Sequence, residues 1–219
     1  MWLIDSSIGR KVVMSVTGMA LILFLTFHMA MNCVALFSED GYRAICEFLG
    51  ANWYALVGTV GLAALMVIHF IYAFWLSWQN YKARGSSRYA VTERPKTVEW
   101  SSQNMLVIGI IVCIGLFIHL INFWSKMQLV EIMGDKPADG VDLIRNTFSK
   151  WYFALVYLVW LFFIWLHLTH GFWSAIQTVG WSSKVWHKRW KVIGNVCITL
   201  LILGFASVLV LYFGKSLMA

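Results

Sequence analysis

The sequence predicts an all-α integral membrane protein, and two observations lead to this fold class. Of the 219 residues, 60% are apolar and 12% are charged, whereas soluble globular proteins have about 45–50% apolar and about 25% charged residues. Five stretches of at least 23 residues contain no Lys, Arg, Asp or Glu, and a transmembrane helix needs about 20 residues. We therefore expect five transmembrane helices, at about residues 12–37, 53–81, 101–124, 151–179 and 192–213.

Charged or aromatic residues mark where each expected helix meets the membrane surface. Trp is enriched at membrane–water interfaces, and charged side chains avoid the hydrocarbon layer. In chain order, the spans lie between Lys11 and Glu39, Trp53 and Lys82, Trp100 and Lys126, Trp151 and Lys184, and Lys191 and Lys215.

The residues outside these spans are too few for a separate extramembrane domain, so residues 1–219 are expected to form one transmembrane domain. The composition excludes a water-soluble enzyme and, despite the net charge of +7, a nucleic-acid-binding protein. The first apolar stretch follows Arg10 and Lys11 as in a signal peptide. Because it is too long and lacks a small-residue cleavage pattern, we interpret it as a retained helix.

The distribution of charge predicts the orientation of the chain. The N-terminus and the expected loops 82–99 and 184–191 hold 11 of the 17 Lys and Arg and three of the ten acids, a net charge of +8. The other loops and the C-terminus have a net charge of −1. Basic loops stay in the cytoplasm, so we expect the N-terminus inside and the C-terminus outside.

Five of the six histidines lie within the charge-free spans. A titratable side chain in hydrocarbon costs free energy, which makes it a functional candidate. The alternative for any single histidine is a hydrogen bond between helices, worth about 0.6 kcal/mol. The five are His28, His69, His119, His167 and His170, and the fifth span has none.

Depth in the membrane groups four of these histidines into two pairs. At about 1.5 Å per residue, His69 and His167 lie about 24 Å below the outer surface, while His28 and His119 lie about 24–28 Å above the inner surface. A tetrahedral zinc ion needs three or four converging ligands. Two imidazoles at one depth instead favour a haem with one axial ligand on each face, held in a helical bundle. The sequence thus predicts four haem-bearing helices plus a fifth.

Small residues near the histidines fit the same hypothesis. Gly18 precedes His28 by ten residues, and Gly109 precedes His119 by the same interval. Glycines let a flat ring approach the backbone, although they also serve ordinary helix packing. The other candidates of this kind are Gly58, Gly61, Gly115 and Gly171.

The sequence resembles the dihaem cytochrome b membrane anchor of succinate dehydrogenase and quinol:fumarate reductase, in its single five-span form. The similarity runs from about Gly9 to Phe213 and includes four motifs. These are Ser15-Val-Thr17-Gly18 before His28, His69-Phe-Ile-Tyr72, Gly109 before His119, and His167-Leu-Thr-His170-Gly171-Phe-Trp173. The resemblance implies that His28 and His119 ligate the outer haem and that His69 and His167 ligate the inner haem.

The resemblance also implies roles for residues beyond the iron ligands. Arg145 would pair with propionates of the outer haem, and Ser15 would lie near those of the inner haem. Some family members carry a glutamate and a further basic residue where this chain has Trp165 and Thr178. We therefore expect Lys184 or His170 to serve the inner propionates instead.

By this resemblance, the chain is expected to be an electron-transfer subunit of a bacterial cytoplasmic (inner) membrane complex. It would pass electrons between quinone, expected to be menaquinone, and iron–sulfur and flavoprotein subunits, through two b haems. Succinate and fumarate would react on the flavoprotein, so this chain would not itself catalyse that chemistry. Glu47 is the candidate acceptor of the quinol proton, and its alternative is a solvated loop acid.

Two other functions stay open from the residues alone. One is a dihaem cytochrome b that serves another respiratory dehydrogenase, such as a hydrogenase or formate dehydrogenase. The other is a haem-free, proton-coupled transporter whose histidines relay protons or bind an ion. Broken or half-length apolar helices would favour the transporter, and the sequence predicts none.

Overall fold

The computed structural model describes residues 5–50, 52–83 and 99–218, and these residues form helices and connections without a strand. Five of the helices are long and apolar enough to cross a membrane, which confirms the predicted all-α membrane fold. They are α2 (Ser7–Cys33), α4 (Trp53–Ala83), α6 (Met105–Asn122), α9 (Trp151–Thr178) and α10 (Lys184–Met218).

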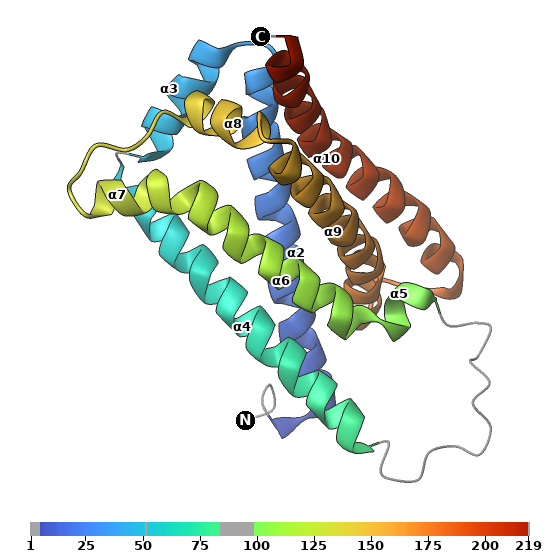
Figure 1. Cartoon of the computed structure of the whole chain (residues 1–219). Coiled ribbons are helices and arrows are strands. Elements are labelled where there is room, and N and C mark those ends of the chain that lie inside the picture. Colours follow the sequence, from blue (N-terminus) through green and yellow to red (C-terminus); the bar gives the residue numbers. More distant parts are fainter. Residues whose placement is uncertain (1–4, 51, 84–98, 219) are drawn as a thin grey trace.

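Shorter helices join the long ones, and three of them gather at the end of the bundle where α10 finishes (Figure 1). These three are α3 (Glu39–Gly50), α7 (Gln128–Ile132) and α8 (Gly140–Phe148). The opposite end of the bundle has α5 (Trp100–Gln103) and the start of α2. The remaining short elements are the 3-10 turns η1 (Val34–Leu36) and η2 (Trp124–Lys126).

Side-chain caps fix where two of these helices begin. The Ser6 hydroxyl accepts a hydrogen bond of 2.8 Å from the backbone N–H of Gly9 at the start of α2. The Asp139 carboxylate accepts one of 3.0 Å from the N–H of Asp142 at the start of α8. Such caps satisfy backbone donors that have no partner within the helix.

Two sequence expectations about loops are wrong. Residues 184–191, expected to be a loop, are helical because α10 begins at Lys184. The connection between the expected spans 101–124 and 151–179 contains the helix α8. The end of an apolar stretch marks where the side chains leave the hydrocarbon layer. The helix itself can continue beyond that point, because its backbone hydrogen bonds also form in water. The 35 residues of α10 span about 52 Å, which exceeds a hydrocarbon thickness of about 30 Å.

The long helices pack unequally. Helix α9 contacts α10 most extensively, and α2 lies against α4, α9 and α10. Two buried apolar clusters form the core, one around Tyr157 and Tyr212 and the other around Leu161 and Ile198. None of the residues of α4 is buried, and its main neighbour is α2. Helix α4 is therefore the most peripheral of the five.

The closest contact between α6 and α9 depends on a glycine. A Cβ atom added at Gly115 would overlap the indole ring of Trp160. The indole N–H of Trp160 donates a hydrogen bond of 3.0 Å to the backbone carbonyl of Val112. Gly115 thus serves helix packing and leaves room for Trp160.

We predict that Gly115→Ala destabilises the chain by about 1–3 kcal/mol, the usual cost of overpacking. The matched control is Gly58→Ala on α4, where an added Cβ would meet nothing within 4 Å. Because alanine favours a helix over glycine by about 0.5–1 kcal/mol, the control should be neutral or slightly stabilising. Unfolding by a denaturing detergent, followed by circular dichroism, measures both, and equal stabilities would contradict the prediction.

Candidate functional site: two histidine pairs

Four of the histidines within the long helices meet as two pairs, each formed across two helices. The ring centroids of His28 on α2 and His119 on α6 are 5.9 Å apart, with ring planes at 84°. Those of His69 on α4 and His167 on α9 are 6.3 Å apart, with ring planes at 69°. The structure therefore brings together the same two pairs that we predicted from the depth of each histidine in its span. Ligation of iron by these histidines stays a prediction.

The spacing within each pair fits two axial ligands of one metal. With metal–imidazole bonds of about 2 Å, and about 1.2 Å from each bonding nitrogen to its ring centre, two opposed imidazoles have centroids about 6.4 Å apart. Both measured separations, 5.9 and 6.3 Å, are close to this value. In the described ranges no group of three or more His, Cys, Asp or Glu side chains could hold a metal ion. Each pair therefore offers two imidazole donors, one from each of two helices.

Aromatic rings surround the outer pair. Phe24 stacks on His28 at 5.5 Å and Phe205 lies at 5.7 Å from it, while Trp160 lies 5.7 Å from His119. The side-chain amide nitrogen of Asn32 is 3.4 Å from Nε2 of His28. Nδ1 of His119 is buried without a hydrogen-bond partner among the described residues. Tyr157 lies 6.2 Å from His119, so the neighbours of the pair are mainly aromatic and include the polar groups of Asn32 and Tyr157.

The inner pair is held mainly by residues of α2. The Thr17 hydroxyl oxygen is 3.1 Å from Nδ1 of His69. A Cβ atom added at Gly18 would lie 3.2 Å from Cε1 of the same ring. Across the pair, Nδ1 of His167 is buried and has no hydrogen-bond partner in the part of the chain that the structure describes.

The repeated glycine interval has a structural counterpart. Gly18 lies beside His69, and a Cβ atom added at Gly109 would lie 3.9 Å from Cε1 of His167. Gly18 and Gly109 each precede a histidine of the outer pair by ten residues, and each lies beside a histidine of the inner pair. At the other predicted positions, Gly58, Gly61 and Gly171, an added Cβ would meet nothing within 4 Å.

The residues predicted for the inner propionates are separated. Lys184 is exposed at the first turn of α10, and Ser15 is buried within α2. Nδ1 of His170 is 3.9 Å from a carboxylate oxygen of Glu99, beyond hydrogen-bonding distance. The other Glu99 oxygen accepts a hydrogen bond of 2.7 Å from Lys191. Sequence reasoning missed Glu99 and Lys191, although both are charged residues at the inner edge of a span.

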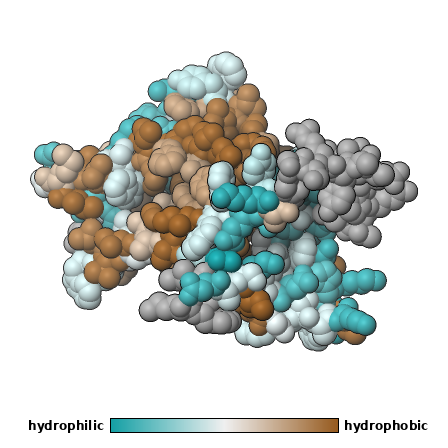
Figure 2. Space-filling view, turned by 90° about the horizontal axis from the view of Figure 1, so that it is seen from below, coloured by the Kyte–Doolittle hydropathy of each residue, from teal (hydrophilic) through white to brown (hydrophobic). Residues whose placement is uncertain are grey.

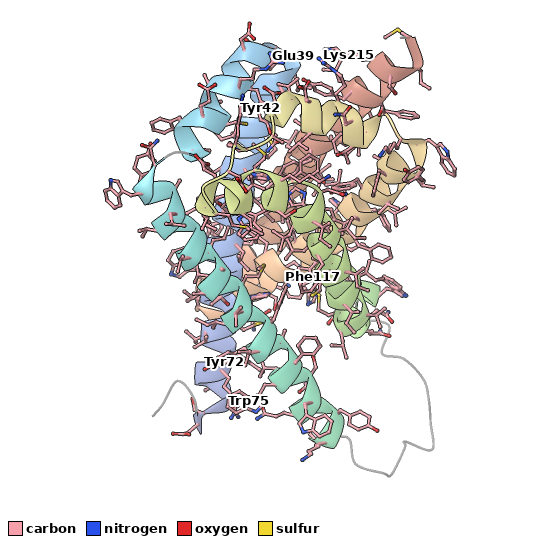
Figure 3. All side chains as sticks on the ribbon, turned by 60° about the vertical axis from the view of Figure 1, so that its left-hand side comes forward. Glu39, Tyr42, Tyr72, Trp75, Phe117 and Lys215 are labelled. Atoms are coloured by element: carbon pink, nitrogen blue, oxygen red, sulfur yellow. The ribbon has the colours of Figure 1, made fainter. Side chains whose placement is uncertain are left out.

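Arg145 joins an ion-pair cluster at the end of the bundle where α10 finishes. Its guanidinium is 3.0 Å from the carboxylate of Glu39, which is also 3.1 Å from the ammonium of Lys215. The Tyr212 hydroxyl donates to the same carboxylate at 3.3 Å. Glu39 and Lys215 approach one another at the top of Figure 3. This cluster ties together α3, α8 and α10, so Arg145 has acidic partners within the protein.

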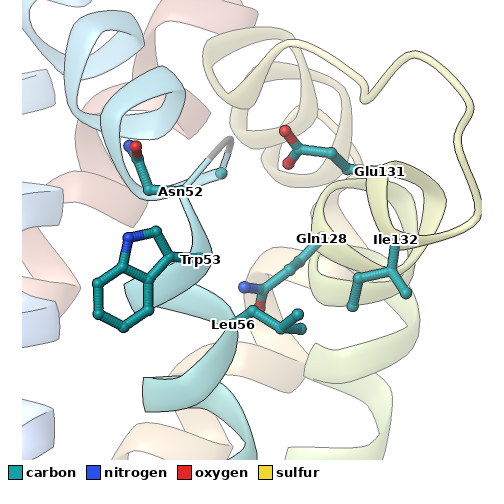
Figure 4. A pocket seen from close by; sticks show the side chains of 7 residues that line it. Asn52, Trp53, Leu56, Gln128, Glu131 and Ile132 are labelled. Atoms are coloured by element: carbon teal, nitrogen blue, oxygen red, sulfur yellow. The ribbon is translucent and has the colours of Figure 1, made fainter.

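A cavity of about 180 Å³ lies between the start of α4 and α7 (Figure 4). The carbonyl oxygen of the Gln128 side chain accepts hydrogen bonds from Thr59, at 2.8 Å, and from Trp124, at 3.0 Å. Glu131 extends toward the α3–α4 junction, where a Cβ atom added at Gly50 would approach its carboxylate to 2.7 Å. The residues that line the cavity are Gly50, Asn52, Trp53, Leu56, Gln128, Glu131 and Ile132.

The predicted proton acceptor Glu47 is exposed on α3 and does not line this cavity. Sequence reasoning missed Gln128 and Glu131. The available signal was their position just after Trp124, a residue that marks the outer interface.

Comparisons of the chain with protein-family models, with curated proteins and with solved structures find no match.

The outer ion-pair cluster predicts a pH dependence of stability. Hydrogen bonding to Lys215, followed by the charges of Lys215 and Arg145, holds the pKa of Glu39 below its ordinary 4.5, against an opposing effect of burial. A carboxyl group with a lowered native pKa stabilises the fold above its unfolded-state pKa and loses that effect as the pH falls through the native value.

We therefore expect Glu39→Gln to destabilise the chain at pH 7, by about 0.2–1 kcal/mol for each exposed pair lost. The difference from wild type should shrink as the pH falls below about 4.5. Asp40→Asn is the matched control, because the Asp40 side chain is 95% exposed and its ion pair is with Arg43, three residues away on the same helix. Detergent unfolding at pH 7 and pH 4 measures both variants, and a Glu39→Gln effect that does not change with pH would contradict the assignment.

Proposed function

We propose that this chain is a membrane cytochrome b that holds two haem groups, the outer one between His28 and His119 and the inner one between His69 and His167. The observation that carries the proposal is the meeting of four intramembrane histidines as two pairs, with ring separations of 5.9 and 6.3 Å. When bound there, haem would supply an iron that takes up and releases one electron at a time.

The protein residues contribute position and environment. Helices α2, α4, α6 and α9 each supply one histidine, so each haem would join two helices. The aromatic side chains around His28 and His119 exclude water from the outer pair. Gly18 and Gly109 keep the backbone free of Cβ atoms beside the inner rings. These features suit a flat apolar group held edge-on inside a bundle.

We further propose that the chain anchors an iron–sulfur subunit and a flavoprotein subunit at its inner end. The family resemblance carries this assignment, including the succinate and fumarate chemistry of the flavoprotein and the bacterial inner membrane. In Figure 2, hydrophilic side chains cover part of the end of the molecule that is seen from below, beside hydrophobic ones. At this end α10 exposes Lys184, Lys188 and Arg189, a basic surface that would attract an acidic partner subunit.

The cavity at the outer end is our proposed site for the head group of the quinone, expected to be menaquinone. Trp53, Leu56 and Ile132 provide apolar walls. The side-chain oxygen of Gln128 already accepts two hydrogen bonds, which leaves its amide N–H groups to donate to a quinone oxygen (Figure 4). The Glu131 carboxylate borders the same space and can accept a quinol proton, so it joins Glu47 as a candidate base.

The ligation hypothesis predicts separate losses of haem. Replacing His28 or His119 by alanine should remove the outer haem, and replacing His69 or His167 should remove the inner haem. His170→Ala is the control, because His170 lies outside both pairs, and it should retain both haems. Haem content and reduced-minus-oxidised spectra of the purified chain measure the outcome. A wild-type chain without haem, or loss of a haem in His170→Ala alone, would overturn the proposal.

The two candidate bases predict different rates of haem reduction by quinol. Loss of a general base typically lowers a rate by about 10²–10⁴-fold, so Glu131→Gln should slow reduction by at least about 100-fold. Glu47→Gln should have little effect, since Glu47 is exposed outside the cavity. Stopped-flow spectroscopy follows the reaction, and reduction by dithionite should be equal in all three proteins. Slowing in Glu47→Gln alone would assign the role to Glu47.

A further inference from the structure

The two histidines of the inner pair differ in how their second ring nitrogen is held. Nδ1 of His69 is 3.1 Å from the hydroxyl oxygen of Thr17 on α2. Nδ1 of His167 is buried and lacks a hydrogen-bond partner among the described residues. The orientation of only one ring of this pair is therefore set by a side-chain hydrogen bond.

The hydrogen bonds of Thr17 decide which group is the donor. Its hydroxyl oxygen lies 2.9 Å from the backbone carbonyl of Val13 and 3.1 Å from that of Met14. A hydroxyl has one hydrogen and two lone pairs, and both carbonyls are acceptors, so the hydrogen points to the backbone. A lone pair of Thr17 then faces His69, and the 3.1 Å contact is a hydrogen bond in the tautomer whose Nδ1 carries the proton.

This arrangement determines the tautomer of His69. A neutral imidazole with its proton on Nδ1 has an unprotonated Nε2, which is the form that binds a metal. Gly18, the next residue, leaves room for the ring edge, because a Cβ atom there would lie 3.2 Å from Cε1 of His69.

We infer that Thr17 is a positioning residue, whose hydroxyl holds His69 with Nε2 ready to bind iron and thereby tunes the inner haem. This inference rests on the proposed haem ligation. A partner that accepts a hydrogen bond from a metal-bound histidine fixes the ring and raises its basicity, and its loss typically costs 10–100-fold in metal affinity. A more basic ligand stabilises the ferric iron, so Thr17 lowers the reduction potential of the inner haem.

The decisive variants are Thr17→Val, which keeps the shape and removes the hydroxyl, and Thr17→Ser, which keeps the hydroxyl. Thr17→Val should weaken binding of the inner haem by at least about 10-fold, the lower end of the usual range. It should also raise the midpoint potential of that haem. Thr17→Ser should match wild type in both respects.

The matched control is Thr26→Val, on the same helix, because the Thr26 hydroxyl donates to the backbone carbonyl of Ile22 at 2.9 Å. Haem titration and redox potentiometry of the purified chain measure both haems, and the outer haem serves as an internal reference. Thr26→Val should alter neither haem. If Thr17→Val does not fold, Thr17→Ala removes the same hydroxyl with less bulk.

A second measurement does not require haem. Nitrogen NMR of the haem-free chain labelled at histidine, with His69 assigned by substitution, reports which nitrogen carries the proton. We expect the Nδ1–H form in wild type and in Thr17→Ser, and a mixture in Thr17→Val. A wild-type chain that binds no haem but shows this pattern would refute the proposed function and leave the tautomer assignment intact. Equal spectra, haem affinities and potentials in Thr17→Val and wild type would overturn the inference.

Discussion

A histidine inside a hydrocarbon layer needs a polar partner, and this requirement determines how four of the long helices of this protein are arranged. The helices α2, α4, α6 and α9 each present a histidine to a second histidine across the bundle. The glycines, aromatic rings and hydroxyl groups beside them follow from this arrangement. Helix α10 carries no histidine in its membrane-spanning part and packs against α9 through apolar side chains and a hydrogen bond of 2.9 Å from the indole N–H of Trp165 to the hydroxyl of Thr199.

The sequence predicts the long helices well because the cost of charge in hydrocarbon is a local property of each residue. The pairs of histidines also follow from the sequence, since the constant rise of a helix converts residue number into depth. The start of α10 at Lys184 could not be predicted in this way. Charged residues end a membrane span, but they do not end a helix, and the helix α8 within an expected loop shows the same effect.

Parts of the candidate site that depend on distant residues were not predictable. Arg145 and Glu39 are 106 positions apart, and their contact exists only because α3 and α8 cover the same end of the bundle. Likewise, the side-chain amide of Gln128 is oriented by the two hydrogen bonds that its oxygen accepts from Thr59 and Trp124. Hydropathy and spacing describe each helix separately, whereas these contacts depend on how α4, α7 and α8 approach one another.

The peripheral position of α4 affects how the inner pair could be reached. This helix supplies His69 but has no buried residue, and α2 is its main neighbour. His167, on the other side of the pair, lies on α9, which is held by α2, α6 and α10. Moving α4 outward therefore breaks fewer contacts than moving any other wall of the inner site. The inner pair is therefore easiest to open from the side of α4, and a large apolar group would meet the least resistance there.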